Sequence, residues 1–232
     1  PMSFWVPERR PAEEILDGDI SPHEADASLS DIEWIHRNLG GRALLRRHLL
    51  PLLSSLVPAA PDASLSVLDL GCGSGHVGRN LDTAFARRGG ALRAFGVDLK
   101  LTHARLSPRG RAAAGDALAL PFADRSVDVV LSTLFLHHFS PREVPVLLGE
   151  ARRVARRAVA SFDLTRHRLA LAAISLVGPL VFRTRISTLD GQASVRQAYT
   201  RDEIARLAAP VLPGATVGAA GPFVWRLAWV RT

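Results

Sequence analysis

The stretch Val67-Leu68-Asp69-Leu70-Gly71-Cys72-Gly73-Ser74-Gly75 decides the fold of this chain. Residues 67–70 have the pattern of a short buried strand, and the three alternate glycines allow a tight turn that carries few side chains. Residues 76–88 follow with the pattern of a helix. A strand, a glycine-rich turn and a helix in this order predict a nucleotide-type cofactor site.

A second acidic residue supports this prediction. Asp98 lies in Gly96-Val97-Asp98-Leu99, one helix length after the glycines, where a second strand is expected to end. In a βαβ unit, an acid at this position can accept hydrogen bonds from a ribose diol. The alternative is a glycine turn with a structural role alone, but such a turn would not require the second acid to follow in this order.

The composition indicates one α/β domain with an N-terminal cap. The chain has 232 residues, of which 47% are hydrophobic, and this is enough for a full core. The net charge of +7 comes almost entirely from arginine, since Lys100 is the one lysine. The arginines are spread out and aromatic residues make up only 6%, which does not favour nucleic acid binding. The densest group, residues 152–157, is expected to be a solvated helix face.

Cysteine content and hydrophobic runs predict a cytoplasmic protein. Cys72 is the one cysteine, so no intrachain disulfide can form. The charged residues from Glu8 onward do not have the pattern of a signal peptide. The longest apolar run, residues 169–182, is too short to span a bilayer and is interrupted by Gly178-Pro179. We expect it to form a helix that is buried or that contacts a lipid surface.

The first 60 residues are predicted to form an arm and a helical cap. Residues 1–20 are rich in proline and charge, and we expect an extended arm that packs only locally. A capping box at residues 21–24 predicts a helix that ends at Gly40-Gly41. A second helix begins at Arg42 and is expected to bend or break at Pro51, before residues 58–62 link it to the first strand.

Strand and helix patterns then alternate over residues 61–232, which predicts a doubly wound, mostly parallel, seven-stranded Rossmann-like sheet. Further capping boxes are predicted at residues 140–143 and 200–203. The last two strands are expected to form an antiparallel hairpin. The seven predicted strands are 65–70, 92–98, 111–115, 127–134, 158–163, 215–220 and 223–230.

The glycine cluster also spells a dinucleotide fingerprint, because Gly73, Gly75 and Gly78 fit G-x-G-x-x-G. Asp69 stands directly before the glycines, where it would repel a pyrophosphate but attract a cation. The acid therefore favours a sulfonium amino-acid cofactor.

With Gly115-Asp116-Ala117 and LPFADRSVDVV at residues 120–130, the chain resembles the class I methyltransferases that use S-adenosylmethionine. The resemblance covers residues 65–163 and is to the small-molecule type 11 or ubiquinone-biosynthesis-like group. It implies that the glycine stretch binds the methionine portion and adenosine, that Asp98 holds the ribose, and that Asp116 and Ala117 border the adenine. The residues predicted to bind the cofactor are Asp69, Gly71, Cys72, Gly73, Gly75, Asp98, Leu99, Asp116, Ala117 and Ser132.

Two histidines at the end of the fourth predicted strand are the candidate catalytic residues. His137 or His138 could take a proton from an acceptor with a high pKa, although a role in structure or orientation is favoured. No cysteine or histidine spacing indicates a metal site. The candidate substrate-binding residues are Trp34, His36, Asp163, His167, Arg183 and Arg196.

The residues after the fifth predicted strand favour an apolar acceptor. Residues 164–200 stand where such enzymes insert acceptor-recognition elements, and they contain the apolar run. Ser132-Thr133-Leu134-Phe135 replaces the Asn/Asp-Pro-Pro-Tyr element of amino methyltransferases, so oxygen or carbon is the expected acceptor atom. We expect a small aromatic, polyketide-like or quinone-type acceptor and no nucleic acid partner. The alternatives are an RNA or protein methyltransferase and a non-catalytic cofactor-binding module.

Overall fold

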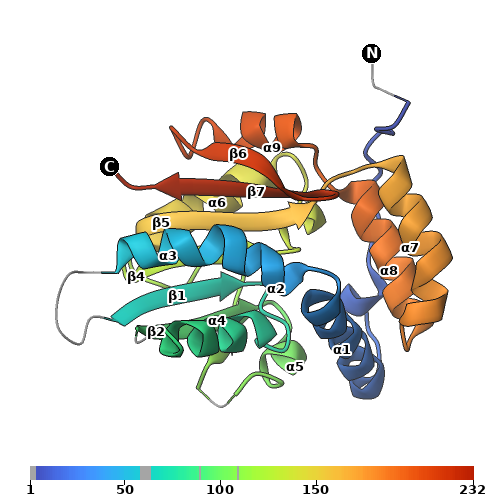
Figure 1. Ribbon diagram of the computed structural model, residues 1–232, viewed down its shortest axis with the longest axis horizontal. Helices are drawn as coiled ribbons and strands as arrows, with labels where there is room; N and C mark the ends of the chain where they lie inside the picture. The colour runs from blue at the N-terminus through green and yellow to red at the C-terminus, as the bar shows by residue number, and fades with distance from the viewer. Residues whose placement is uncertain (1–3, 58–63, 89, 109) are drawn as a thin grey trace.

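The apolar runs of the sequence form one seven-stranded sheet with helices on both faces (Figure 1). The computed structural model describes residues 4–57, 64–88, 90–108 and 110–232. The strand order is β3-β2-β1-β4-β5-β7-β6, in which β7 runs antiparallel to its two neighbours. The strands are β1 (Ser64–Leu70), β2 (Ala91–Asp98), β3 (Ala112–Ala114), β4 (Val127–Thr133), β5 (Ala155–Leu164), β6 (Thr216–Gly221) and β7 (Val224–Val230).

The predicted sheet is confirmed, including its antiparallel C-terminal hairpin. All seven strands lie within a few residues of their predicted positions. The structure adds the position of β7, which inserts between β5 and β6. The predicted link at residues 58–62 and the domain boundary at residues 60–61 lie outside the described residues.

Alternating side chains of β1 enter two separate cores. Leu68 and Leu70 are fully buried with side chains of α6 (Glu143–Val154) and α9 (Arg201–Ala208). Val67 faces the other side and packs with residues of α3 (Leu50–Leu56) and α4 (His76–Ala86). This explains why the strand is apolar on both faces, as expected for a parallel strand covered by helices on both sides.

The N-terminal helices follow their predicted signals, with one difference. α1 (Pro22–Asn38) has the predicted capping box, in which Ser21 and Glu24 bond each other's backbone. The second helix does not break at Pro51. It runs through α2 (Gly41–Leu44), a π-helical turn (Leu45–Leu49) and α3 without interruption. The wider turn directly before Pro51 accommodates a residue that has no backbone N–H to donate.

Capping signals farther along the chain have mixed outcomes. The box at Thr200 and Glu203 is complete and opens α9. The predicted box before α6 forms only in part, because the Glu143 carboxylate accepts from the Ser140 backbone at 2.8 Å while the Ser140 side chain provides no cap. α6 consequently begins at Glu143.

The prediction that the N-terminal arm packs only locally is wrong. The backbone N–H groups of Ile15 and Leu16 donate to the Asp190 carboxylate at 2.7 and 2.9 Å. The Arg9 guanidinium donates to the carbonyl oxygens of His137 and Phe139, both at 3.0 Å. The arm, which includes the short helix η1 (Ile15–Asp17), therefore crosses the molecule and binds elements more than 100 residues away.

The dense arginines are also not a solvated helix face. α6 ends at Val154, so Arg156 and Arg157 lie on β5, where both pair with the buried Asp128 carboxylate at 2.8 and 3.1 Å. Arg153 pairs with Glu150 at 2.7 Å. These arginines hold strand and helix ends together and do not form a free basic surface.

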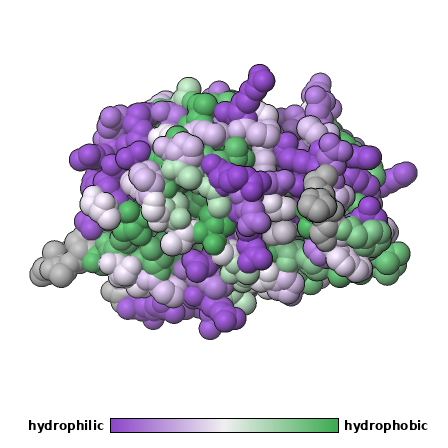
Figure 2. Space-filling view, turned by 90° about the horizontal axis from the view of Figure 1, so that it is seen from above, coloured by the Kyte–Doolittle hydropathy of each residue, from purple (hydrophilic) through white to green (hydrophobic). Residues whose placement is uncertain are grey.

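The apolar run forms α7 (Arg168–Val181), which packs as a hairpin with α8 (Arg185–Gln197) at one end of the molecule. Figure 2 shows hydrophobic residues gathered at this end. Leu176 and Leu180 on α7 are 74% and 85% exposed, so the run is only partly buried. Among the described residues, no helix is both long and apolar enough to cross a bilayer.

Candidate active site

The carboxyl ends of β1, β2, β4 and β5 meet at one edge of the sheet, and strand register brings the predicted site residues together there. Leu70 pairs with Val97 on β2 and with Ser132 on β4. The glycine turn therefore begins between the ends of two neighbouring strands. The sheet order reverses at this point, which is where open α/β sheets bind ligands.

The glycine turn has the backbone shape that a cofactor loop needs. Gly71, Gly73 and Gly75 adopt positive φ angles of 66°, 51° and 71°. At Gly71 a side chain would also collide with the ring of Phe135, because a Cβ atom would lie 2.2 Å from it. Glycine is required there both for the backbone conformation and for the close contact.

Asp98 joins the second strand to this turn. Its Oδ2 accepts from the Gly73 N–H at 2.9 Å and its Oδ1 accepts from the Lys100 N–H at 3.0 Å. The buried His103 places Nδ1 3.4 Å from the same Oδ1. Each carboxylate oxygen has a further lone pair, so Asp98 can still accept a ligand hydroxyl while it orders the loop.

Asp69 lies beneath the turn with only 3% of its surface exposed, and its Oδ1 has no hydrogen-bond partner. Burial and the nearby Asp98 charge raise the pKa of Asp69 to about 8. A carboxyl group at such a position is protonated at neutral pH and would become ionised only beside a cation. This orphaned acceptor is the feature that fits a sulfonium or ammonium group.

His137 is fixed by the end of β5. The chain turns after β4 at Leu134, a non-glycine residue with a φ of 51°, and enters η3 (Leu136–His138). The His137 Nδ1–H then donates to Asp163 Oδ1 at 2.6 Å, and its backbone N–H donates to Oδ2 at 3.0 Å. Asp163 therefore sets the position of the ring and accepts a hydrogen bond from its proton-bearing Nδ1.

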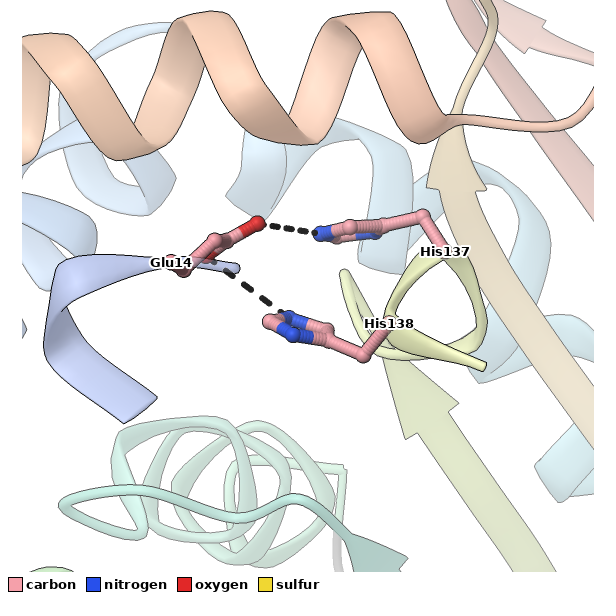
Figure 3. Close-up of side chains that lie close together, drawn as sticks. All are labelled: Glu14, His137 and His138. Atoms are coloured by element: carbon pink, nitrogen blue, oxygen red, sulfur yellow. Dashed lines mark ion pairs between the residues drawn. The ribbon is translucent and has the colours of Figure 1, made fainter. Parts of the chain in front are cut away.

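The arm supplies Glu14, which lies between the two histidines (Figure 3). Glu14 Oε1 is 3.3 Å from His137 Nε2, and Oε2 is 3.8 Å from His138 Nε2. The other nitrogen of His138, Nδ1, is 2.8 Å from Asp17 Oδ2. Ser194 and Gln197 on α8 donate to Glu14 Oε1 at 2.6 and 2.9 Å and hold it in place.

Charge in this cluster bears on the proposed base. Although burial opposes it, the carboxylates of Asp163 and Glu14 raise the pKa of His137 to about 10. A ring protonated on both nitrogens cannot take a further proton. The raised pKa of His137 therefore supports an orienting role over the role of base.

A cavity of about 200 Å³ opens beside the cluster. It is lined by Ala12, Glu13, Glu14, Asp17, Gly18 and His138. The Lys100 ammonium donates to the carbonyl oxygens of Leu16 and Gly18, so the arm wall of the cavity is tied to a residue two positions after Asp98. Lys100 thus links the arm wall of the cavity to the end of β2.

Several predicted substrate residues lie elsewhere. His36 is 8% exposed and packs edge-on against His76, with 4.8 Å between ring centroids, and burial lowers its pKa to about 4. Trp34 lies half-buried on α1. His167 caps α7 by accepting from the Leu169 N–H at 3.1 Å. Of the predicted substrate residues, Asp163 is the one the structure joins to the histidines.

The two arginines are not at the cavity either. Arg183 is exposed, and its backbone N–H donates to Asp31 on α1. Arg196 is half-buried on α8, with its guanidinium 3.4 Å from the side chain of Gln192. Neither residue lines the 200 Å³ cavity.

The remaining predicted cofactor residues differ in exposure and in their contacts. Leu99 is 76% exposed, which leaves an apolar side chain free beside Asp98. Asp116 is exposed and accepts from the Leu118 N–H, whereas Ala117 is buried in the core. Cys72 is buried in the turn itself. The Ser132 hydroxyl donates to Ser161 inside the sheet, so it is already used there.

Sequence reasoning missed Glu14 and Asp17. Both lie in a polar, proline-rich segment that has no helix or strand periodicity, and Glu14 is separated from His137 by 123 positions in the sequence. His103, which contacts Asp98, was also missed. No local pattern in the sequence indicated these residues.

Comparison with known proteins identifies the central part of the chain. Residues 67–158 match a family described as a methyltransferase domain, and this segment runs from within β1 to within β5 and includes the glycine turn and Asp98. The chain carries a methyltransferase domain, as the sequence predicts. A search of the curated proteins found no match.

Solved structures of methyltransferases share the fold of this chain. The plantazolicin methyltransferase BpumL, in complex with S-adenosylhomocysteine and a substrate analogue, is 15% identical over 91% of each chain, with a TM-score of 0.63. The magnesium protoporphyrin IX methyltransferase ChlM from Synechocystis PCC 6803 is 18% identical over 93% of this chain and 90% of its own, with a TM-score of 0.53. A methyltransferase from Aquifex aeolicus is 17% identical, with 72% and 82% covered and a TM-score of 0.50.

Proposed function

We propose that this methyltransferase transfers the methyl group of S-adenosylmethionine to a hydroxyl oxygen of a small, largely apolar acceptor. The observation that carries the proposal is the cavity between the N-terminal arm and His138, whose arm wall is bonded to Lys100, two positions after Asp98. Membership of the ubiquinone-biosynthesis-like subgroup and an aromatic acceptor stay predictions from the sequence.

The chain's own residues fit the cofactor. The orphaned Asp69 carboxyl oxygen would face the cationic methionine end, and the free lone pairs of Asp98 would accept the ribose hydroxyls. The exposed Leu99 offers an apolar surface for the adenine ring. When bound, the cofactor supplies a methyl group on a sulfonium cation, whose charge disappears on transfer.

Orientation is the main contribution that the protein can make to this reaction. Holding an acceptor in line with the methyl group can lower the barrier by about 7 kcal/mol or more in favourable cases. The arm forms a wall of the cavity, and bonds from Arg9, Lys100 and α8 hold that wall. A cavity with fixed walls restricts the acceptor to few orientations.

Charge in the cavity favours a hydroxyl group over a carboxylate as the acceptor. Glu13, Glu14 and Asp17 line the cavity, and three carboxyl groups would repel an anionic acceptor. A neutral phenol or alcohol can instead donate a hydrogen bond to one of them. The arginines that could have paired with a carboxylate, Arg183 and Arg196, do not line the cavity. An ether is therefore favoured over an ester as the product.

The same carboxylates disfavour RNA as the acceptor, because a phosphate backbone binds through basic side chains. The densest basic residues, Arg153, Arg156 and Arg157, are engaged in ion pairs.

The proposal is tested with purified protein in two steps. Isothermal titration calorimetry with S-adenosylhomocysteine should show binding in the wild type and a loss of about tenfold or more in Asp98→Ala, with Asp26→Ala as an exposed control on α1. Labelled methyl transfer is then measured across matched phenols and benzoic acids. Transfer to the acids but not to the phenols would contradict the hydroxyl proposal, and absence of cofactor binding would contradict the activity.

A further inference from the structure

The cluster of Glu14, His137 and His138 brings three potential metal-ligand side chains together, with one ligand atom of each within 4.8 Å of the others. They come from two segments, the arm and η3, and they meet beside the cavity (Figure 3). Two histidines and one carboxylate are a ligand set of catalytic zinc sites.

The spacing of the atoms is compatible with an ion bound between them. Glu14 oxygens lie 3.3 Å from His137 Nε2 and 3.8 Å from His138 Nε2. Ligand atoms bound tetrahedrally to zinc at about 2.0–2.1 Å lie about 3.3–3.4 Å from each other. The separation at His138 is too long for a hydrogen bond, but a small movement of this 23% exposed side chain would bring it to a metal–ligand geometry.

Both histidines are oriented as metal ligands usually are. A metal-bound histidine almost always donates its second ring N–H to a carboxylate or carbonyl. His137 Nδ1 bonds Asp163 at 2.6 Å, and His138 Nδ1 lies 2.8 Å from Asp17. The Nε2 atoms of both rings are consequently the ones that face Glu14.

The His137 Nε2 atom supplies an independent indication of a ligand. The residue is 2% exposed, and this nitrogen has no hydrogen-bond partner of acceptable geometry. Once the second proton has left the ring, Nδ1 still donates to Asp163, and the lone pair on Nε2 faces the Glu14 carboxylate. Two such acceptors need a cation between them, which is either a proton or a metal ion.

We propose that the Nε2 atoms of His137 and His138 and the carboxylate of Glu14 bind one divalent transition-metal ion of the Zn²⁺ type. Three protein ligands leave a fourth position open toward the cavity that Glu14, Asp17 and His138 line. A Mg²⁺ ion is disfavoured because it prefers oxygen ligands. That the open position meets the acceptor hydroxyl rests on the proposed function, whereas the metal site itself does not.

Metal binding is measured on the 232-residue chain, which is treated with a chelator and then titrated with Zn²⁺ in competition with a chromophoric chelator. The wild type should bind one ion per chain, and Co²⁺ in its place should give visible ligand-field bands. Glu14→Gln and His138→Ala should each weaken Zn²⁺ binding by at least tenfold, and Asp17→Asn by about tenfold through the orientation of His138. His23→Ala, an exposed histidine on α1, is the matched control.

Two results would overturn the site. Wild-type protein that binds Zn²⁺ no more tightly than the Glu14→Gln/His138→Ala double variant would show an adventitious ion only. Unchanged Co²⁺ bands in that variant would place the ion elsewhere. S-adenosylhomocysteine binding and circular dichroism check that each variant is folded, and they also separate the two proposals: a wild type that fails to bind S-adenosylhomocysteine contradicts the proposed activity, while the metal titration still decides the site.

Discussion

Asp69→Asn should make the unliganded protein more stable and its cofactor binding weaker. The Asp69 carboxyl is buried beneath the glycine turn, and burial raises its pKa from 3.8 to about 8. In the unfolded chain the group ionises near its ordinary value. Between about pH 4 and pH 8 the folded protein therefore binds one more proton than the unfolded chain, and stability falls as the pH rises.

The size of the effect follows from the difference between the two pKa values. Each pH unit above the lower pKa reduces the free energy of unfolding by about 1.4 kcal/mol. At pH 7, Asp69 therefore reduces it by an amount on the order of 4 kcal/mol. An asparagine cannot ionise and removes the penalty. For a domain of this size, such a change corresponds to an increase in melting temperature of about 10 °C at pH 7, and to almost no change at pH 4.

The assay is thermal unfolding of both proteins from pH 4 to pH 9, with Asp26→Asn as a control because Asp26 is an exposed acid on α1. The wild-type curve should fall with pH relative to the variant, and the control should follow the wild type. Calorimetry should show weaker S-adenosylmethionine binding in Asp69→Asn, since the cationic cofactor loses its buried partner. Parallel pH curves for the wild type and Asp69→Asn would refute the reasoning.

Three further substitutions test how the site is held. Gly71→Ala should abolish cofactor binding measured by calorimetry, because it would place a Cβ atom against the Phe135 ring at a positive φ, whereas Gly40→Ala, which meets no atom within 4 Å, should retain binding. Asp31→Ala removes the acceptor that joins α1 to the start of α8 and should lower the free energy of unfolding by about 3 kcal/mol in urea titration. Arg166→Met should lower the free energy of unfolding by about 3–5 kcal/mol in the same assay, because the fully buried guanidinium pairs with Glu203 and donates to the arm. An unchanged urea midpoint in Asp31→Ala or in Arg166→Met would contradict the role given to that residue.

The strand positions could be predicted because each signal is local. Leu68 and Leu70 alternate with residues that face the other core, and Gly71 to Gly75 allow a turn that few other residues can form. The capping boxes of α1 and α9 likewise depend on residues three positions apart. Backbone geometry and burial of neighbouring side chains decide such features, and both can be derived from a short segment.

Asp98 shows how far a local argument reaches into the site. The sequence pattern placed Asp98 at the end of β2. Because the carboxyl ends of parallel strands meet at one edge of the sheet, this also placed it near the glycine turn. The hydrogen bond from Gly73, which engages the same carboxylate in ordering the loop, depends on strand register and on the turn conformation together. The sequence indicated the residue, while the structure determined which atoms are engaged.

The sequence by itself determined the sheet, the glycine turn and the class of enzyme, because periodicity, glycine conformation and a family motif are each contained in short segments. Only the tertiary structure brought Glu14 between His137 and His138, and it did so through side-chain bonds from α8 to a segment with no periodic pattern of its own. Contacts between residues 123 positions apart depend on how the whole chain closes, since chain closure fixes pair distances that no local propensity contains.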